Sequence, residues 1–211
     1  MQRLPYLLLM IVGFLSGLGV PIHAQAPAET AVYAVAYVEV MPSTRAPMAA
    51  ALKQYRDTSR KEDGYVRFEL LEQVGRSGHV AVVEVWKDQK AFDYDQRPYK
   101  SLTVAPARPA GNGQAVQVVA HVDIGGGAQA QADALGLLRQ LADASRKEQG
   151  GVRFDVLQHA MRANHFTVVE TWQSLEALHA HRSALHTRQY RDAVQPMTGS
   201  PLDERVYTAV E

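Results

Sequence analysis

The sequence contains no cysteine among its 211 residues. This absence excludes a disulfide framework, a thiolate metal site, a thiol nucleophile and a lipid-attachment cysteine. The chain also lacks a charge bias, because 22 Lys and Arg residues balance 22 Asp and Glu residues. Without a basic stripe the sequence gives no sign of binding nucleic acid or an anionic membrane surface. No glycine motif for nucleotide binding is present either.

A long apolar run from Leu4 to Val20 follows Arg3 near the N-terminus. Glycine and serine interrupt this run, which is shorter than the ~20 residues of a membrane-spanning helix. A small-residue cleavage site ends at Ala24, so we predict a removed signal peptide over residues 1–24. The mature protein is therefore expected to be periplasmic or secreted, with no membrane attachment. Loss of Arg3 leaves it with a net charge of about −1.

An internal repeat organises the rest of the chain. Ser59–Glu72 (SRKEDGYVRFELLE) and Ser145–Gln158 (SRKEQGGVRFDVLQ) are identical at nine of fourteen positions without a gap. The same spacing of 86 residues places Glu84-Val85-Trp86 on Glu170-Thr171-Trp172. Because the match continues upstream into residues 36–40 and 120–124, the duplicated unit has the size of a domain.

Hydrophobic periodicity predicts the same element order in both copies. Alternating apolar residues predict strands, and apolar residues spaced by three or four predict helices that end before Gly64 and Gly150. Copy 1 is predicted as a strand over 31–40, a helix, strands over 66–71 and 80–86 and a helix near 88–97. Copy 2 is predicted as a strand over 115–124, a helix, strands over 152–160 and 164–172, a helix over 174–193 and a strand over 202–210.

This order, β-α-β-β-α-β, predicts an α+β protein of two tandem ferredoxin-like units whose open sheet faces cover each other. We place the first unit at 25–103 and the second at 115–211. The Pro- and Gly-rich segment 104–114 reads as a linker. Either copy 1 then lacks its last strand, or the strand over 115–124 serves both sheets.

Copy 2 resembles the antibiotic biosynthesis monooxygenase family, including quinol monooxygenase-like members, and copy 1 resembles it more weakly over residues 31–103. The residues that carry the resemblance are Glu170, Trp172, His181, His186, Tyr190 and the turn from Pro196 to Asp203. The resemblance implies a dimeric α/β barrel, here formed within one chain. It also implies oxygenation of electron-rich aromatic substrates such as quinols or anthrones, with O2 and without a cofactor.

Copy 1 departs from this pattern, because Asp95 stands where copy 2 has His181 and Lys100 where it has His186. We therefore expect the site in copy 2. Haem-degrading relatives carry a Trp near the position of His181 and a downstream His where this chain has Arg191. Haem degradation is disfavoured on that ground.

His181 and His186 are the first candidate catalytic residues. A neutral imidazole can take a phenolic proton, and the resulting anion reacts more readily with O2. The alternative is a structural histidine at the helix surface or core edge. On one continuous helix, two residues five positions apart point in directions about 140° apart. We therefore expect the two rings not to share a face. The same geometry argues against a metal site, and we predict none.

Glu170 is the third candidate catalytic residue, because a carboxylate on an apolar strand face is either paired or raised in pKa. The alternative is a salt bridge to Arg153 or Arg67 on the adjacent strand. Trp172, Phe154, Tyr190 and His121 are the candidate substrate-binding residues. His121 and its counterpart Tyr37 could line a pocket or close the contact between the sheets.

The sequence therefore favours a cofactor-independent monooxygenase acting on a small aromatic or quinol-type substrate. One alternative is a non-catalytic protein on the same fold that binds a small ligand or a partner, and another is a histidine-rich exported protein that binds metal. Whether two chains form a homodimer is left open.

Overall fold

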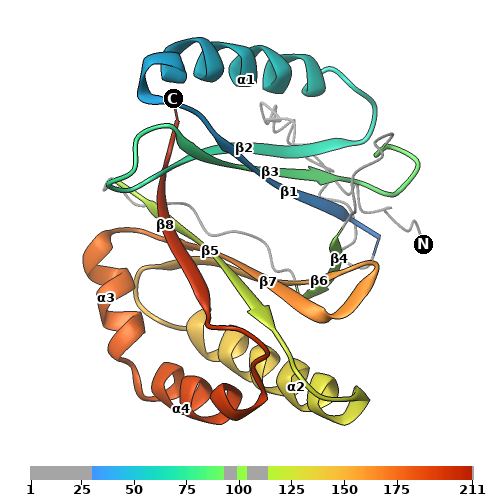
Figure 1. Cartoon of the computed structure of the whole chain (residues 1–211), viewed down its shortest axis with the longest axis vertical. Coiled ribbons are helices and arrows are strands. Elements are labelled where there is room, and N and C mark those ends of the chain that lie inside the picture. Colours follow the sequence, from blue (N-terminus) through green and yellow to red (C-terminus); the bar gives the residue numbers. More distant parts are fainter. Residues whose placement is uncertain (1–29, 93–98, 104–113, 211) are drawn as a thin grey trace, which may run out of the picture.

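The computed structural model describes residues 30–92, the backbone of 99–103, and residues 114–210. The predicted signal peptide and nearly all of the predicted linker lie outside these residues. In the described part of the chain, the strands form a closed barrel in the order β1-β3-β2-β8-β5-β7-β6-β4 (Figure 1). The strands are β1 (Val32–Glu39), β2 (Tyr65–Gln73), β3 (His79–Trp86), β4 (Tyr99–Thr103), β5 (Val116–Asp123), β6 (Gly151–His159), β7 (Arg162–Trp172) and β8 (Asp203–Ala209).

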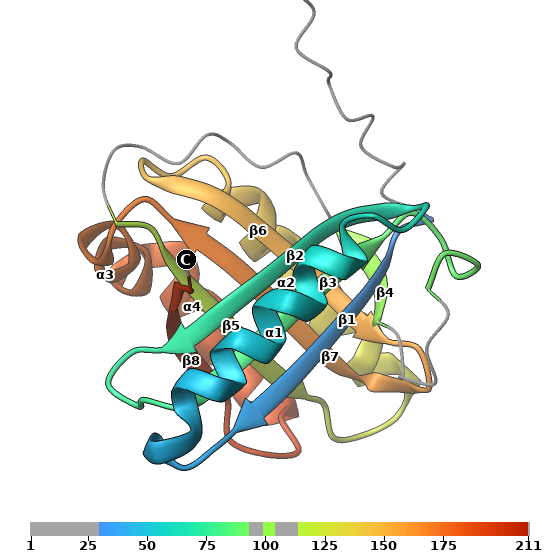
Figure 2. The same ribbon diagram turned by 90° about the horizontal axis from the view of Figure 1, so that it is seen from above.

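Helices cover the barrel from two opposite sides. Helix α1 (Arg45–Ser59) lies over the strands of copy 1 and runs roughly along them, as Figure 2 shows from above. Helices α2 (Ala128–Ser145), α3 (Leu175–Ser183) and α4 (Leu185–Val194) cover the strands of copy 2 on the far side (Figure 1). Short 3-10 turns precede α1 and follow α4, at Pro42–Thr44 and Gln195–Met197. Within the described residues, no helix combines the length and apolar character needed to cross a membrane.

The two copies are joined by their last strands. β8 pairs with β5 of its own copy and with β2 of copy 1, while β4 pairs with β1 of its own copy and with β6 of copy 2. Both predicted alternatives for the end of copy 1 were therefore wrong. β4 is its last strand, and β5 pairs only with strands of copy 2 among the described residues. Exchanging the last strands leaves no unpaired sheet edge, which explains the closed barrel.

The second helices differ from their prediction. In copy 1, residues 88–91 form a bend and a turn instead of a helix, and residues 93–97 of the predicted helix lie outside the described residues. In copy 2, the predicted helix over 174–193 is divided into α3 and α4 at Ala184, whose ψ of 148° is extended. Lys100 lies in β4, the counterpart of β8. The 86-residue spacing therefore stops holding after β3, because copy 1 reaches its last strand by a much shorter connection.

The largest core lies between α2, α3, α4 and the outer face of the copy 2 strands. Ala134 and Leu138 of α2 are fully buried against Val118 and Phe154 of the sheet. Burying a side chain of the size of Leu138 contributes about 1.5–3 kcal/mol. This confirms the predicted apolar face of the helix and fixes the outer face of β5, β6 and β7 as the one that faces the helices.

The barrel interior holds ion pairs that repeat with the same 86-residue spacing. Arg153 of copy 2 donates to Glu69 of copy 1 at 2.9 Å, and Arg67 of copy 1 lies 3.6 Å from Asp155 of copy 2. Arg67 and Arg153 are equivalent positions of the two copies, and so are Glu69 and Asp155. Each arginine therefore contacts the equivalent carboxylate of the other copy. Such reciprocity is the signature of a two-fold interface, here within one chain.

His121 lies at the other end of the barrel interior. It contacts its counterpart Tyr37 in a short Nε2 to hydroxyl hydrogen bond, and its Nδ1 lies 2.9 Å from Thr167 Oγ1. Its ring stacks on His165, with ring centroids 5.2 Å apart. The structure thus places this pair between the two sheets, which was one of the two predicted settings.

We expect His121 to make the protein less stable in mild acid. Burial, followed by the charge of His165, lowers the pKa of His121 from 6.5 to about 4. The folded state therefore resists a proton that the unfolded chain accepts, so stability falls as the pH drops from 6.5 towards 4, by about 3 kcal/mol at most. The other charged groups that act on the ring are Asp203, Arg205 and Asp123.

Urea unfolding of the wild type and His121→Gln at pH 7 and pH 4.5 measures this effect. The substitution should flatten the pH dependence, and an identical pH slope in both proteins would exclude His121 as its source.

Candidate functional site

The turn that follows α2 carries the carboxylate at the centre of the site. Glu148 lies in this turn, and Arg146 fastens the turn to β6 by donating to the Phe154 carbonyl at 2.6 and 3.1 Å. Gly150 then adopts a φ of +84°. A Cβ added there would lie 2.6 Å from the Ala177 side chain of α3, so glycine permits the close approach of α3 to the turn.

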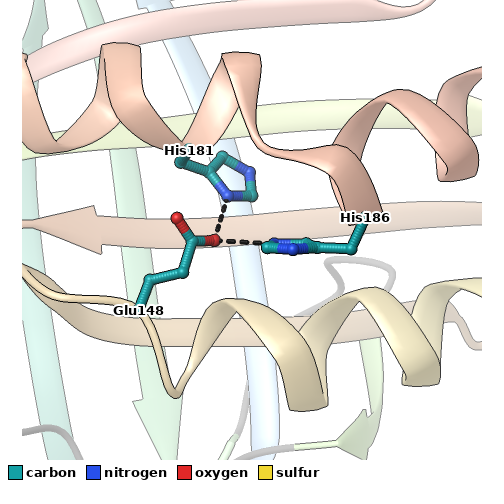
Figure 3. A group of neighbouring side chains, drawn as sticks. All are labelled: Glu148, His181 and His186. Atoms are coloured by element: carbon teal, nitrogen blue, oxygen red, sulfur yellow. Dashed lines mark hydrogen bonds and ion pairs between the residues drawn. The ribbon is translucent and has the colours of Figure 1, made fainter.

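Both candidate histidines meet this carboxylate. His181 Nδ1 lies 2.7 Å and His186 Nε2 2.8 Å from the same atom, Glu148 Oε1 (Figure 3). The expectation that the rings would not share a face was wrong, because it assumed one continuous helix. The extended residue Ala184 ends α3 between them and redirects α4. The donor atoms of Glu148, His181 and His186 lie within 4.8 Å of one another, so this group could hold a metal ion.

His181 is enclosed by aromatic rings. Its imidazole, 3% exposed, stacks on Trp172 with centroids 4.5 Å apart and lies edge-on to Phe154 at 5.9 Å. Burial lowers its pKa, against the opposing effect of the Glu148 hydrogen bond. The ring is therefore mainly neutral at pH 7. With Nδ1 directed to Glu148, the other nitrogen, Nε2, lies 3.9 Å from Glu170 Oε2.

Glu170 is buried beside His181 and accepts a hydrogen bond from Trp172 Nε1 at 2.7 Å. Burial raises its pKa to about 8, although that hydrogen bond opposes the shift. The side chain is therefore mostly a neutral acid at pH 7. The alternative salt bridge was wrong. Arg153 and Arg67 point into the barrel, whereas Glu170 points to the helices on the opposite face of the strands.

These side chains line a pocket between the helices and the outer face of the copy 2 strands. Its volume is about 40 Å³. The Tyr190 hydroxyl is buried and has no hydrogen-bond partner within the described residues. Burial, and then the charge of Glu170, raises the Tyr190 pKa, so the hydroxyl stays protonated. The lining residues are Ala120, Val122, Leu141, Phe154, Val168, Glu170, His181, Thr187, Tyr190, Arg191, Leu202 and Glu204.

A charged network borders the pocket. Glu204 of β8 accepts from Arg182 Nε at 2.8 Å and from Arg191 Nη2 at 3.0 Å, which ties α3 and α4 to the strand. Sequence reasoning did not identify this network, nor did it identify Glu148. The one available signal for Glu148 was its place in the repeated Ser-Arg-Lys-Glu segment.

The equivalent place in copy 1 is built differently. Trp86 Nε1 donates to Glu84 at 3.2 Å, which repeats the Trp172 to Glu170 contact. The Tyr55 hydroxyl, however, lies 3.4 Å from both oxygens of Glu84, at the position that Leu141 occupies in copy 2. The Tyr55 phenol of copy 1 therefore lies beside Glu84 on the side that corresponds to the pocket-facing side of Glu170 in copy 2. Asp95 lies outside the described residues.

The structure brings most of the predicted site residues together. Phe154, Glu170, His181 and Tyr190 line the pocket, and Trp172 supports His181 from one side. His186 lies on the far side of Glu148, and its ring is 6.0 Å from that of His181. His121 lies apart from the others inside the barrel, so its proposed contact with substrate remains a prediction.

Comparison with known proteins identifies the repeated unit. The family described as "Antibiotic biosynthesis monooxygenase" matches residues 31–95 and again residues 116–193. The chain is also 30% identical over 59 residues to "Putative monooxygenase YcnE" of Bacillus subtilis. That match covers 28% of this chain and 62% of YcnE, which is less than two thirds of its length.

Solved structures share the whole barrel. A crystal structure titled "Putative monooxygenase" from Fusobacterium nucleatum matches with a TM-score of 0.74 and 12% identity, covering 86% of this chain and 93% of its own. An "anthrone oxidase-like protein" matches with a TM-score of 0.67 and 11% identity, covering 87% and 92%. At these identities the comparison supports the fold alone.

Proposed function

The chain belongs to the antibiotic biosynthesis monooxygenase family, whose unit it carries twice, and we propose that it is a monooxygenase working through copy 2. The proposed substrate is a small phenolic or quinol-type aromatic compound, and the proposed compartment is the periplasm or the exterior. The observation that carries the proposal is the Glu148–His181 pair. It directs one imidazole nitrogen to a carboxylate and leaves the other beside the pocket.

His181 is the proposed general base. Glu148 Oε1 accepts a hydrogen bond of 2.7 Å from the Nδ1–H group, which selects the tautomer with a lone pair on Nε2. Nε2 can then take the proton of a substrate hydroxyl, and the imidazolium that forms lies against the Glu148 carboxylate. The same division of labour between carboxylate and imidazole operates in hydrolytic triads. The product of this step is an electron-rich oxyanion that O2 can oxidise.

Tyr190 and Glu170 are the proposed hydrogen-bond donors to that oxyanion. The Tyr190 hydroxyl has no other partner in the described residues, and Glu170 is mostly protonated at pH 7. Two neutral donors in an apolar pocket stabilise a developing negative charge without preventing the substrate from binding. Phe154 and Val168 supply the apolar wall for the ring.

The reaction balances without an added reductant. A quinol and O2 give a hydroxyquinone and water: one oxygen atom forms a new bond to a ring carbon in place of hydrogen, and the other leaves as water. The substrate supplies all four electrons that O2 accepts. In this proposal the protein's own residues bind the ring, remove the hydroxyl proton and stabilise the anion.

The pocket must widen to admit a ring. Its volume of about 40 Å³ accommodates O2 or about three water molecules, whereas ligand pockets usually measure about 300–1,000 Å³. Leu202 and Arg191 line it and are partly exposed, so they are the side chains placed to move.

Leu202→Ala is expected to lower KM for a ring substrate by roughly tenfold or less, with a smaller change in kcat, because it widens the entrance and leaves the proposed base untouched. Steady-state oxygen uptake measures both constants. Leu185→Ala, at an exposed residue of α4 that does not line the pocket, is the control. Equal KM values for Leu202→Ala and the wild type would place the entrance elsewhere.

Oxygen uptake by tag-free protein with a panel of quinols and anthrones tests the proposed activity. With 18O2 and a quinol, we expect product that carries one labelled oxygen atom and labelled water in equal amount. A folded sample that consumes no oxygen with any member of the panel would rule the proposal out.

A further inference from the structure

We propose that Glu148, His181 and His186 form a binding site for a divalent transition-metal ion such as Zn²⁺. The site joins the turn after α2 to α3 and α4 (Figure 3). Two imidazoles and one carboxylate form a ligand set that suits Zn²⁺ and its neighbours in the first transition row. Three protein ligands leave a fourth position open to water.

The donor atoms are already gathered around one point. His181 Nδ1 and His186 Nε2 both face Glu148 Oε1, at 2.7 and 2.8 Å. Around a tetrahedral ion with ligand distances of about 2.05 Å, neighbouring donors are about 3.3 Å apart. Each nitrogen therefore needs to move about 0.5 Å away from the carboxylate oxygen, and the two nitrogens, which lie within 4.8 Å of each other, need to reach the same separation of about 3.3 Å. Rotations of the Glu148 and His186 side chains supply these movements.

The surroundings hold the ligands and leave a path for the ion. His181 is fixed between Trp172 and Phe154, and its free nitrogen faces Glu170 at 3.9 Å. A carboxyl group that accepts a hydrogen bond from the free ring nitrogen is a typical outer partner of a metal-ligating histidine, and Glu170 would take this role after an approach of about 1 Å. His186 and Glu148 are 31% and 17% exposed, so an ion can reach the site from the surface.

Metal binding would also control the proposed activity, and this step rests on the proposed function. An ion on Nδ1 of His181 takes the lone pair there, so Nε2 carries the ring proton. Nε2 is the nitrogen that the proposed mechanism needs as a base. The metal-bound protein is therefore inactive, and the metal-free protein is active.

Isothermal titration calorimetry of the metal-free full chain, without a histidine tag, tests the site with Zn²⁺ as the probe. We expect one ion per chain with micromolar or tighter affinity, together with a rise in Tm on binding. His186→Ala should weaken binding more than about hundredfold, because losing even an outer-shell partner costs about 10–100-fold. His179→Ala is the control, since His179 is exposed on α3 and lies outside the group.

His186→Gln, which can keep a hydrogen bond to Glu148, replaces the alanine variant if the latter does not fold. Failure of the wild type to bind Zn²⁺, or equal affinity in wild type and the His186 variant, would overturn the site. In the oxygen-uptake assay, Zn²⁺ should inhibit the wild type, and half-inhibition of the His186 variant, measured relative to that variant's own activity without metal, should need a much higher Zn²⁺ concentration. If no substrate supports uptake, calorimetry still decides the metal site, so the two proposals fail independently.

Discussion

Replacing His181 with alanine is expected to lower kcat/KM for oxygen uptake by about 10²–10⁴-fold, the usual contribution of a general base. This equals about 2.7–5.4 kcal/mol of transition-state stabilisation. The reason is geometric, because within the described residues no other imidazole lines the pocket. Steady-state kinetics with the best substrate of the panel measures the loss.

Two further variants separate loss of the base from other effects of the substitution. His179→Ala changes an exposed histidine on the same helix and should leave kcat/KM unchanged. His181→Gln keeps a hydrogen bond to Glu148 but cannot act as a base, so it should lose as much activity as the alanine variant while preserving the packing on Trp172. Retention of more than a tenth of the activity in both His181 variants would contradict the assigned role.

Replacing Arg153 with methionine is expected to destabilise the protein by about 3–5 kcal/mol. The Arg153 side chain is 2% exposed and lies between Glu69 at 2.9 Å and Asp155 at 3.6 Å, across the contact between the copies. Its removal leaves two carboxylates facing each other inside the barrel with only Arg67 to balance them. Urea unfolding followed by circular dichroism measures the change.

The double variant Arg153→Met with Glu69→Met should recover part of this loss, because removing both members of a buried pair is often close to neutral. Arg67→Met is the matched control. The Arg67 side chain is 25% exposed and its ion pairs measure 3.6 and 3.7 Å, so the loss should be smaller. A loss below about 1 kcal/mol for Arg153→Met would show that the barrel does not depend on this pair.

The repeat made the architecture predictable from the sequence. Strand periodicity in Val66–Leu71 and its counterpart assigned alternate side chains to opposite sheet faces, and the structure confirms the buried helix face at Leu138. The reciprocal contacts of Arg153 with Glu69 and of Arg67 with Asp155 could not be read in advance. They arise only when two copies are placed about a common axis, and residues of one copy say nothing of that placement.

Two features of the site were beyond sequence reasoning for physical reasons. Alanine is the strongest helix former, so nothing local marks the break at Ala184 that lets His186 reach Glu148. Glu148 itself lies in a turn, more than thirty positions before His181, and its role depends on the close approach at Gly150. By contrast Glu170, His181 and Tyr190 belong to the pattern that resembles the family, Phe154 was a separate candidate for the substrate-binding wall, and all four line one pocket.

The central claim is that Glu148 holds the His181 imidazole as the base of copy 2. It is tested most directly by comparing Glu148→Gln with Glu62→Gln, the same substitution 86 residues earlier. The measurement is kcat/KM for oxygen uptake with the same quinol. The account predicts a loss of at least about tenfold for Glu148→Gln and no change for Glu62→Gln, whose side chain is exposed. Equal activity of the two variants, whether both retained or both lost, would contradict it.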